Sequence, residues 1–349
     1  MGINKRWILT FVSVLIIFLM LLSSINYIVD PFGVFGDKFF KWDTYNIVNN
    51  QRIGKIDYLD KYHNKFDSYI IGGSKSGAMI PGKLEKYFEG SKFYSMLMYG
   101  GDFYDYELIA KYLIDNYEVK NLVLHMSVFE IKRYGRGEGI QNQPHAKVTG
   151  ESLPKFYFKF FTLNLDYSRE KVEAWLKEDK TLCSVIRSED GVFEKTKIDK
   201  RLRENPEEFV VQEPSFHKKH YNIGNIGLYK NVEALKEIKE YCENHNVNFF
   251  AIAAPTHYLE MDAFHREKFT EYWREISQIT DFWDFSGYNS ISMDSRNFYD
   301  VSHYSNHVGE LMMARMFDDN SIDVPEDFGI YVTKDNVEEV LGEKFKNDK

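Results

Sequence analysis

Hydrophobic positions are concentrated near the start of the chain, in one uncharged run over residues 7–29. At 1.5 Å per helical residue, about 23 residues span roughly 35 Å, which exceeds the ~30 Å hydrocarbon core of a bilayer. Trp7 and Tyr27 stand at the two edges of the run, where amphipathic rings favour the membrane interface. The pattern predicts a transmembrane helix over residues 7–29.

A cleavable signal peptide is the competing interpretation of this segment. Its apolar core would span about 7–15 residues and end in a small-x-small cleavage site. Here the run is longer and ends in a poor site, Ser23-Ser24-Ile25-Asn26, so an uncleaved signal anchor is favoured. A buried helix of a soluble protein is disfavoured because the run is apolar on every face. Lys5 and Arg6 should remain cytoplasmic, which makes residues 1–6 a cytoplasmic tip and places the rest of the chain outside.

After a polar and aromatic lead-in, expected to be a stalk over residues 30–65, short apolar runs alternate with amphipathic stretches. Strands are predicted at residues 67–73, 92–98, 119–129, 247–254 and 281–287, and helices at 83–88, 103–117, 228–244, 262–278 and 304–317. Such alternation indicates an α/β fold with a mostly parallel sheet and helices on both faces, which is a three-layer α/β/α arrangement.

The rhythm is broken between residues 131 and 221, where glycines 135, 137 and 139 are followed by an amphipathic stretch at 165–178. We interpret 131–221 as an insertion over a single domain that spans residues 66–318. Residues 319–349 are charged and are expected to be a C-terminal tail with a peripheral helix from Lys334.

The composition, 44% hydrophobic and 16% aromatic, is that of a folded protein. The net charge of −9 and the lack of a long basic block argue against nucleic acid as a partner. Two cysteines, Cys183 and Cys242, are too few for a disulfide scaffold, and whether they form one bridge or stay as two thiols is open. No CxxC motif or Cys/His cluster predicts a structural zinc site.

Ligands of open parallel sheets bind at the carboxyl ends of the strands, and two segments there carry candidate chemistry. In the first, Ser74 follows Gly72 and Gly73 at the end of the first predicted strand. Glycine permits a tight turn from which the hydroxyl projects and the following amides face an anion. Alone, the motif equally fits an ordinary turn with Ser74 as a helix N-cap.

The second segment lies just before the last predicted helix, where Asp300 precedes His303 by three residues. An aspartate so placed can hold the imidazole in one tautomer and stabilise its protonated form, while the imidazole removes a proton from a serine hydroxyl. Either residue alone would be an ordinary surface group. Together, in a loop after the last predicted strand and just before the last predicted helix, they are a more specific signal than either alone.

The block GGS at 72–74, combined with DVSH at 300–303, resembles the SGNH hydrolase superfamily. More narrowly, it is similar to the membrane-anchored branch of acyltransferase-like proteins that modify cell-surface polysaccharides and teichoic acids. The resemblance covers roughly residues 66–318. It implies that Ser74 is the nucleophile, with Lys75 in the usual basic position, and that Asp300 and His303 are the acid and the base.

The resemblance also implies an oxyanion site made by the amides of Ser74 and Gly100, with Gly101 as the alternative to Gly100. Two residues depart from the family pattern. Gly73 stands where the family has Asp or Ser, and the third predicted strand ends without the family's Asn. His125 in that strand is either a replacement donor or simply a packed histidine.

By this resemblance the protein is expected to be an extracytoplasmic, membrane-anchored serine O-acyltransferase or esterase that acts on cell-envelope glycans or acyl esters without a cofactor or metal. A multi-pass membrane acyltransferase would be its partner. The alternative is a non-catalytic SGNH-like accessory or scaffold protein of a membrane acyl-export assembly. The sequence does not distinguish transfer from hydrolysis.

Several other residues are assigned structural roles. Ser76 is expected to cap the turn, and a dyad of Ser74 with Lys75 is disfavoured because adjacent side chains point apart. His307 lies one helical turn after His303, but no HExxH glutamate accompanies the two histidines, so no metal is expected. His217 and His220 are expected at the surface. The aromatic run 156–161 is expected to pack, with a substrate groove or the membrane surface as alternatives.

Overall fold

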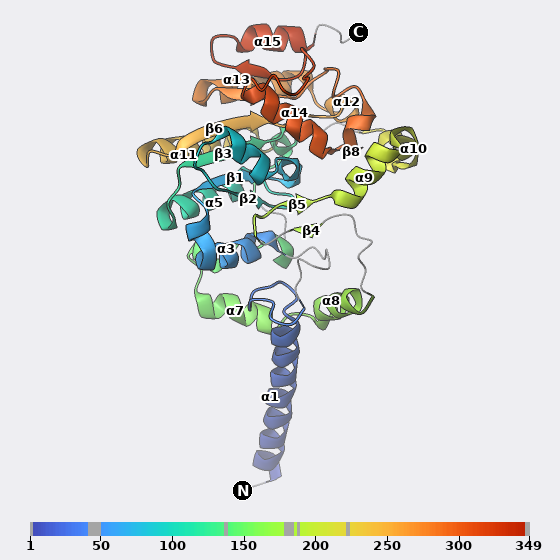
Figure 1. Cartoon of the computed structure of the whole chain (residues 1–349). Helices are drawn as coiled ribbons and strands as arrows, with labels where there is room; N and C mark the ends of the chain where they lie inside the picture. The colour runs from blue at the N-terminus through green and yellow to red at the C-terminus, as the bar shows by residue number, and fades with distance from the viewer. Residues whose placement is uncertain are drawn as a thin grey trace. The chain divides into compact units, whose positions relative to one another are not determined.

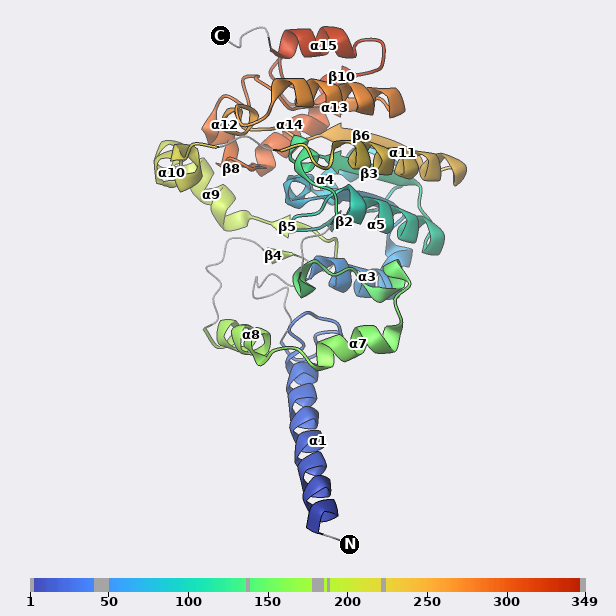
Figure 2. The same ribbon diagram turned by 180° about the vertical axis from the view of Figure 1, so that it is seen from behind.

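The computed structural model describes residues 3–40, 50–135, 139–177, 185–186, 189–220 and 224–345. The chain forms two compact units: residues 1–61 with 139–185, and residues 62–138 with 186–349. The predicted insertion is therefore divided between the two units, and each unit is described separately (Figures 1 and 2). Gly137 and Cys183 lie outside the described residues.

The first unit begins with α1 (Ile3–Val29), drawn in blue in Figure 1. By length and composition, its segment Lys5–Val29 can cross a membrane. Most of its large apolar side chains are exposed, as a lipid-facing helix requires, whereas Val29 at its end is buried. The hydroxyls of Thr10 and Ser24 donate to carbonyl oxygens four residues earlier, so these polar groups are satisfied within the helix.

Helices α7 (Leu153–Phe161) and α8 (Leu165–Lys177) pack against α1 within the first unit. The buried amide of Asn26, near the end of α1, donates to the carbonyls of Phe161 and Leu163 at 3.1 and 2.9 Å and accepts from the Ser168 hydroxyl at 2.9 Å. Both helices are thereby attached to one point on α1. Among its described residues, this unit also contains the helices α3 (Gln51–Tyr62) and α6 (Ala146–Thr149).

The aromatic run 156–161 forms α7, where Phe156 and Phe160 are buried and Phe158 is exposed. Phe156 and Phe160 share a small core with Phe32 and with Ile53 of α3. Helix α3 lies in the segment predicted as a stalk, and its Ile53 is fully buried. This part of the lead-in is therefore folded.

The second unit is built around a six-stranded sheet with the order β10-β7-β6-β3-β1-β2. All neighbouring strands are parallel except β10, which pairs antiparallel with β7. The strands are β1 (Ser68–Gly72), β2 (Phe93–Leu97), β3 (Asn121–Met126), β6 (Asn248–Ala253), β7 (Phe282–Asp284) and β10 (Ile330–Val332). The sheet order reverses between β1 and β3, and a crevice at the carboxyl ends of the strands is expected at such a switch point.

The described helices of this unit are α4 (Pro81–Leu84), α5 (Phe103–Asn116), α9 (Thr196–Glu204), α10 (Pro206–Gln212), α11 (Leu228–Asn244), α12 (Tyr258–Met261), α13 (Arg266–Ile279), α14 (Asn306–Met316) and α15 (Val337–Lys344). Of these, α4, α5 and α11 contact β2, β1 and β6, respectively. Helix α11 packs against both α5 and α13. Val308 and Leu311 of α14 share a core with Ile70, Val123 and Ile252, which come from β1, β3 and β6.

The predicted mixed α/β fold with a mostly parallel sheet is confirmed. The third predicted strand ends at Met126, and a 3₁₀ turn, η4 (Val128–Lys132), follows it. The sheet also extends past residue 318, because β10 pairs with β7 and buries Val332 completely. Most of the segment predicted as a tail is therefore folded onto the second unit, including the predicted helix, which forms α15.

Helix α14 lies directly against the turn that follows β1. A Cβ atom added at Gly309 would lie 2.2 Å from the carbonyl oxygen of Ala78. We predict that Gly309→Ala lowers the free energy of unfolding by about 2 kcal/mol or more, because α14 must move away from the turn. Urea denaturation in detergent measures this change.

Gly342→Ala in α15 is the matched control, since no described atom lies within 4 Å of the added Cβ. It should leave stability unchanged or raise it by about 0.5–1 kcal/mol, as alanine favours the helix. Equal losses in the two variants would contradict the close contact at Gly309.

Candidate active site

The candidate nucleophile lies in a tight turn between β1 and the 3₁₀ turn η2 (Ser74–Ala78). A Cβ atom at Gly72 would lie 2.7 Å from Cβ of Ser76 and 3.0 Å from the carbonyl oxygen of His125, so glycine allows the turn to fold against β3. The buried Ser76 hydroxyl donates to the Gly73 carbonyl at 2.8 Å. Ser76 therefore stabilises the turn through a carbonyl oxygen rather than as the predicted cap, since no side chain caps η2. Ser74 is half-buried.

The candidate acid and base lie on a hairpin formed by β8 (Phe298–Asp300) and β9 (His303–Tyr304). The Tyr299 hydroxyl donates to Asp199 at 2.6 Å and accepts from the amide of Asn306 at 2.9 Å. These contacts tie the hairpin to α9 and to the start of α14. The residue just before Asp300 is thus fixed by two hydrogen bonds of its hydroxyl.

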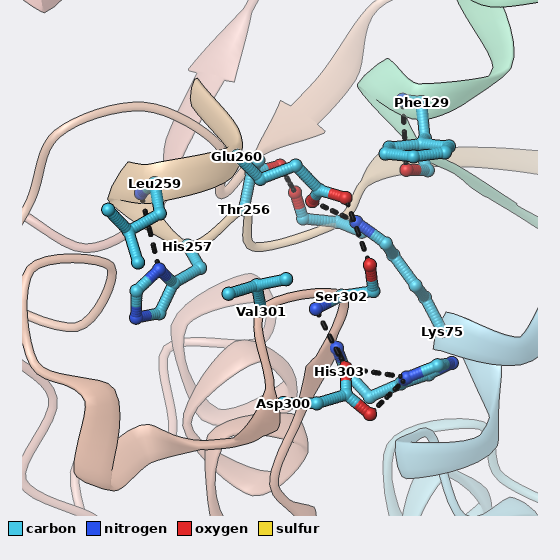
Figure 3. A network of polar contacts seen from close by, with 12 residues as sticks. Lys75, Phe129, Thr256, His257, Leu259, Glu260, Asp300, Val301, Ser302 and His303 are labelled. Carbon is cyan, nitrogen blue, oxygen red and sulfur yellow. Dashed lines mark hydrogen bonds and ion pairs between the residues drawn. The ribbon is translucent and has the colours of Figure 1, made fainter. Parts of the chain in front are cut away.

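The three predicted residues meet. Nε2 of His303 lies 2.8 Å from Oγ of Ser74, although the residues are 229 positions apart. Nδ1 of the same ring lies 2.9 Å from each carboxylate oxygen of Asp300. Figure 3 draws both contacts as dashed lines. With its Nδ1 proton donated to Asp300, the ring presents Nε2 as an acceptor for the serine proton.

The charges of this group suit a general base. Burial opposes ionisation of Asp300, but its hydrogen bond and charge interaction with His303, together with the Ser302 amide, lower the pKa of the carboxyl to about 2. Burial lowers the pKa of His303 below its usual value, as does the charge of Lys195, while Asp300 acts in the opposite direction. At neutral pH a neutral imidazole therefore lies between a carboxylate and a serine hydroxyl.

Ser74 and His303 line a pocket of about 270 Å³. Its wall also includes Gly100, Gly101 and side chains from η4 and the residue that follows it, Arg133. Ligand pockets commonly start at about 300 Å³, so this cavity suits a small group such as a short acyl chain. The pocket opens at the carboxyl ends of β1 and β3, where the sheet order reverses.

The two glycines expected near the oxyanion differ in their hydrogen bonds. The Gly101 amide donates to the Met98 carbonyl at 3.0 Å. Gly100 has φ +55°, a conformation that favours glycine, and its carbonyl accepts from the Arg133 guanidinium. Because the Gly101 amide is already engaged, Gly100 is the better candidate of the two.

His125 is a packed strand histidine. Its ring is buried, its Nε2 lies 2.7 Å from the Tyr304 hydroxyl, and burial lowers its pKa to about 3. The ring therefore stays neutral and helps to hold the hairpin against β3. This position favours the structural alternative over a role as a replacement oxyanion donor.

Sequence reasoning missed three titratable residues close to the site: Glu260, Glu130 and Lys195. Lys75 pairs with Glu260 at 2.7 Å rather than with Ser74, and both side chains of the pair are buried.

Glu130 lines the pocket and accepts from the Tyr106 hydroxyl at 2.7 Å, and burial raises the pKa of its carboxyl to about 8. Lys195 acts on His303 through its charge. Local sequence gives no signal for such contacts, because residues such as Lys75 and Glu260 are 185 positions apart.

The other candidate ligands lie elsewhere. His307 is exposed on α14, His217 is exposed, and His220 is half-buried and bonded to the Ser215 carbonyl. The described residues contain no group of three or more His, Cys, Asp or Glu arranged to hold a metal ion. Cys242 is buried and forms no disulfide within the described part of the chain.

No protein-family model matches the chain, and no curated protein matches it significantly. The site consists of a serine hydroxyl, an imidazole and a carboxylate, which are joined by hydrogen bonds and lie beside a small pocket.

The effect of Lys195 on His303 is directly testable. We predict that Lys195→Met raises the pKa of His303, because it removes a positive charge that disfavours the imidazolium. NMR titration of the His303 ring measures the shift. Lys200→Met, which removes an exposed lysine paired with Glu204 on α9, should leave the midpoint unchanged. An unchanged midpoint in Lys195→Met, or equal shifts in both variants, would contradict the assignment.

Proposed function

We propose that this protein is a membrane-anchored serine acyltransferase or esterase of the SGNH type, which works outside the cytoplasm through an acyl-enzyme on Ser74. The observation that carries the proposal is the chain of hydrogen bonds from Ser74 through His303 to Asp300. A non-catalytic accessory protein has no need to keep a serine hydroxyl 2.8 Å from a histidine that is itself oriented by a carboxylate.

The chemistry follows from the geometry. Ser74 Oγ attacks the carbonyl carbon of an ester while Nε2 of His303 takes its proton, and Asp300 stabilises the imidazolium. The amides of Ser74 and Gly100 are the proposed donors to the oxyanion of the tetrahedral intermediate. His303 then returns the proton to the departing alcohol oxygen, which leaves the acyl group on Ser74.

The second half of the reaction repeats these roles. His303 deprotonates water or a sugar hydroxyl, which attacks the acyl-enzyme and releases Ser74. Attack by water makes the protein an esterase, and attack by a hydroxyl makes it a transferase. We favour transfer to a cell-envelope glycan, because the chain resembles membrane-anchored proteins that modify such glycans.

A three-layer, SGNH-like fold is part of the proposal. It is supported by the sheet order, by the position of Ser74 directly after β1, and by the position of the Asp–His hairpin directly before α14. Gly73 and the lack of the family's Asn after β3 are departures from the pattern, so the third oxyanion donor stays unassigned.

The proposed location rests on α1. Lys5 and Arg6 lie in its first turns, before the apolar run, which favours a cytoplasmic N-terminus and an extracytoplasmic enzyme. A multi-pass membrane acyltransferase is the proposed partner, because the resemblance to membrane-anchored glycan-modifying proteins implies one.

Acyl transfer to a small activated ester tests the function. We predict that the full-length protein in detergent hydrolyses 4-nitrophenyl acetate and gains the mass of one acetyl group on Ser74. Ser74→Ala should lose the adduct and on the order of 10³-fold or more of the rate, because it removes the nucleophile.

Ser76→Ala is the control for Ser74→Ala, since its hydroxyl lies in the same turn but binds the Gly73 carbonyl. It should keep the adduct. In cells, Ser74→Ala should abolish surface acylation without changing the abundance or membrane localisation of the protein. An adduct that persists in Ser74→Ala would move the nucleophile to another residue.

A further inference from the structure

One buried carboxylate connects the two segments that carry the candidate triad. Oε2 of Glu260 lies 2.7 Å from Nζ of Lys75, the residue after Ser74. Its other oxygen, Oε1, accepts from the hydroxyl of Ser302 at 3.1 Å, and Ser302 is the residue before His303. Figure 3 shows Lys75 and Ser302 converging on this side chain.

Glu260 is itself held in place. It lies on α12, where Nδ1 of the buried His257 ring accepts from the amide of Leu259 and caps the helix. Nε2 of the same ring lies 2.9 Å from the Ser295 hydroxyl. Further along the network, the amide of Ser302 donates to Asp300 at 2.8 Å. The start of the helix that carries Glu260 is thus anchored, and Ser302 links the Glu260 carboxylate to the candidate acid, Asp300.

We infer that Glu260 is a positioning residue of the proposed active site. Its two oxygens bind one group from the serine turn and one from the histidine hairpin, so they set the distance between these segments. Moving a catalytic group by about 1 Å can lower the rate about 10²-fold. A link that sets the distance between Ser74 and His303 can therefore have a large effect on turnover. The inference rests on the proposed function.

A purely structural role for the Lys75–Glu260 ion pair is the competing explanation. The same unit contains a second buried ion pair, between Lys344 and Asp284 at 2.9 Å, whose side chains are 6% and 0% exposed. Neither residue lines the pocket around Ser74. Loss of this second pair should destabilise the fold without changing turnover by the folded protein, so it serves as a matched control.

Ser302 gives the cleanest test, because Ser302→Ala removes only the hydroxyl that reaches Glu260. The amide of residue 302 can still donate to Asp300. With 4-nitrophenyl acetate and the full-length protein in detergent, we expect kcat to fall about 10-fold, with KM changed less than about 2-fold. Ser302→Thr keeps a hydroxyl and should keep most of kcat.

A double-mutant cycle with Glu260→Gln extends the test. If Ser302 acts through Glu260, the double variant Ser302→Ala with Glu260→Gln should be no slower than Glu260→Gln alone. Lys344→Met should lower the unfolding midpoint and leave kcat per folded molecule unchanged. If Glu260→Gln does not fold, since it leaves Lys75 buried without a counter-charge, the Ser302 variants decide the question by themselves.

The outcomes separate two failures. Three results would overturn the positioning role alone. They are Ser74-dependent turnover that is unchanged in Ser302→Ala, additive losses of kcat in the double-mutant cycle, and an equal loss of kcat in Lys344→Met. A wild-type protein without Ser74-dependent turnover would overturn the proposed function, and the positioning role with it.

Discussion

The hydrogen bond between Nε2 of His303 and Oγ of Ser74 is the contact on which the proposed chemistry depends. It joins residues 229 positions apart, so it exists only if the sheet brings the two segments to one edge. The register of β1 with β3, in which Gly72 lies opposite His125, aligns the ends of these strands. His125 then contacts Tyr304 of the hairpin, which brings the neighbouring His303 to the same edge.

Both apolar packing and buried polar contacts hold the hairpin, whose Phe298, Val301 and Tyr304 belong to the core of the second unit. Tyr299 contacts Asp199, Tyr304 contacts His125, and Ser302 contacts Glu260, so three consecutive parts of the segment have separate partners. Each buried group would cost free energy if it were left unpaired, which makes the whole arrangement mutually dependent. A change in one partner should therefore be transmitted to the geometry between Asp300, His303 and Ser74.

Much of the second unit could be predicted from local pattern. Strands β1, β2, β3 and β6 are short apolar runs with nearby turn residues, and α11 has the bounds that its hydrophobic spacing predicts. The strands and helices follow from local pattern and from the general topology of parallel sheets. The prediction that Ser74, Asp300 and His303 lie together came from the resemblance of their two motifs to a known family pattern.

The rest depends on contacts between distant residues. β10 has only three residues, and two of them, Ile330 and Tyr331, are exposed, so its pairing with β7 leaves no strong hydrophobic signal. Helix α3 buries the polar residues Arg52 and Lys55 along with its apolar ones, which obscures its pattern. The contact of Glu260 with Lys75 has no sequence signature at all. The division of residues 131–221 between two units has none either.

The most direct measurement of the central claim is the reaction of the full-length protein with a fluorophosphonate, which phosphonylates a serine only when a neighbouring base activates it. Mapped by peptide mass, the label should fall on Ser74 in the wild-type protein and should form far more slowly in His303→Ala. The labelling rate should also rise with pH, and the midpoint of this rise should lie below the usual histidine pKa, because burial and the charge of Lys195 favour the neutral His303 ring. Labelling of another residue, or a rate on Ser74 that is the same without His303, would contradict a catalytic Ser74–His303 pair.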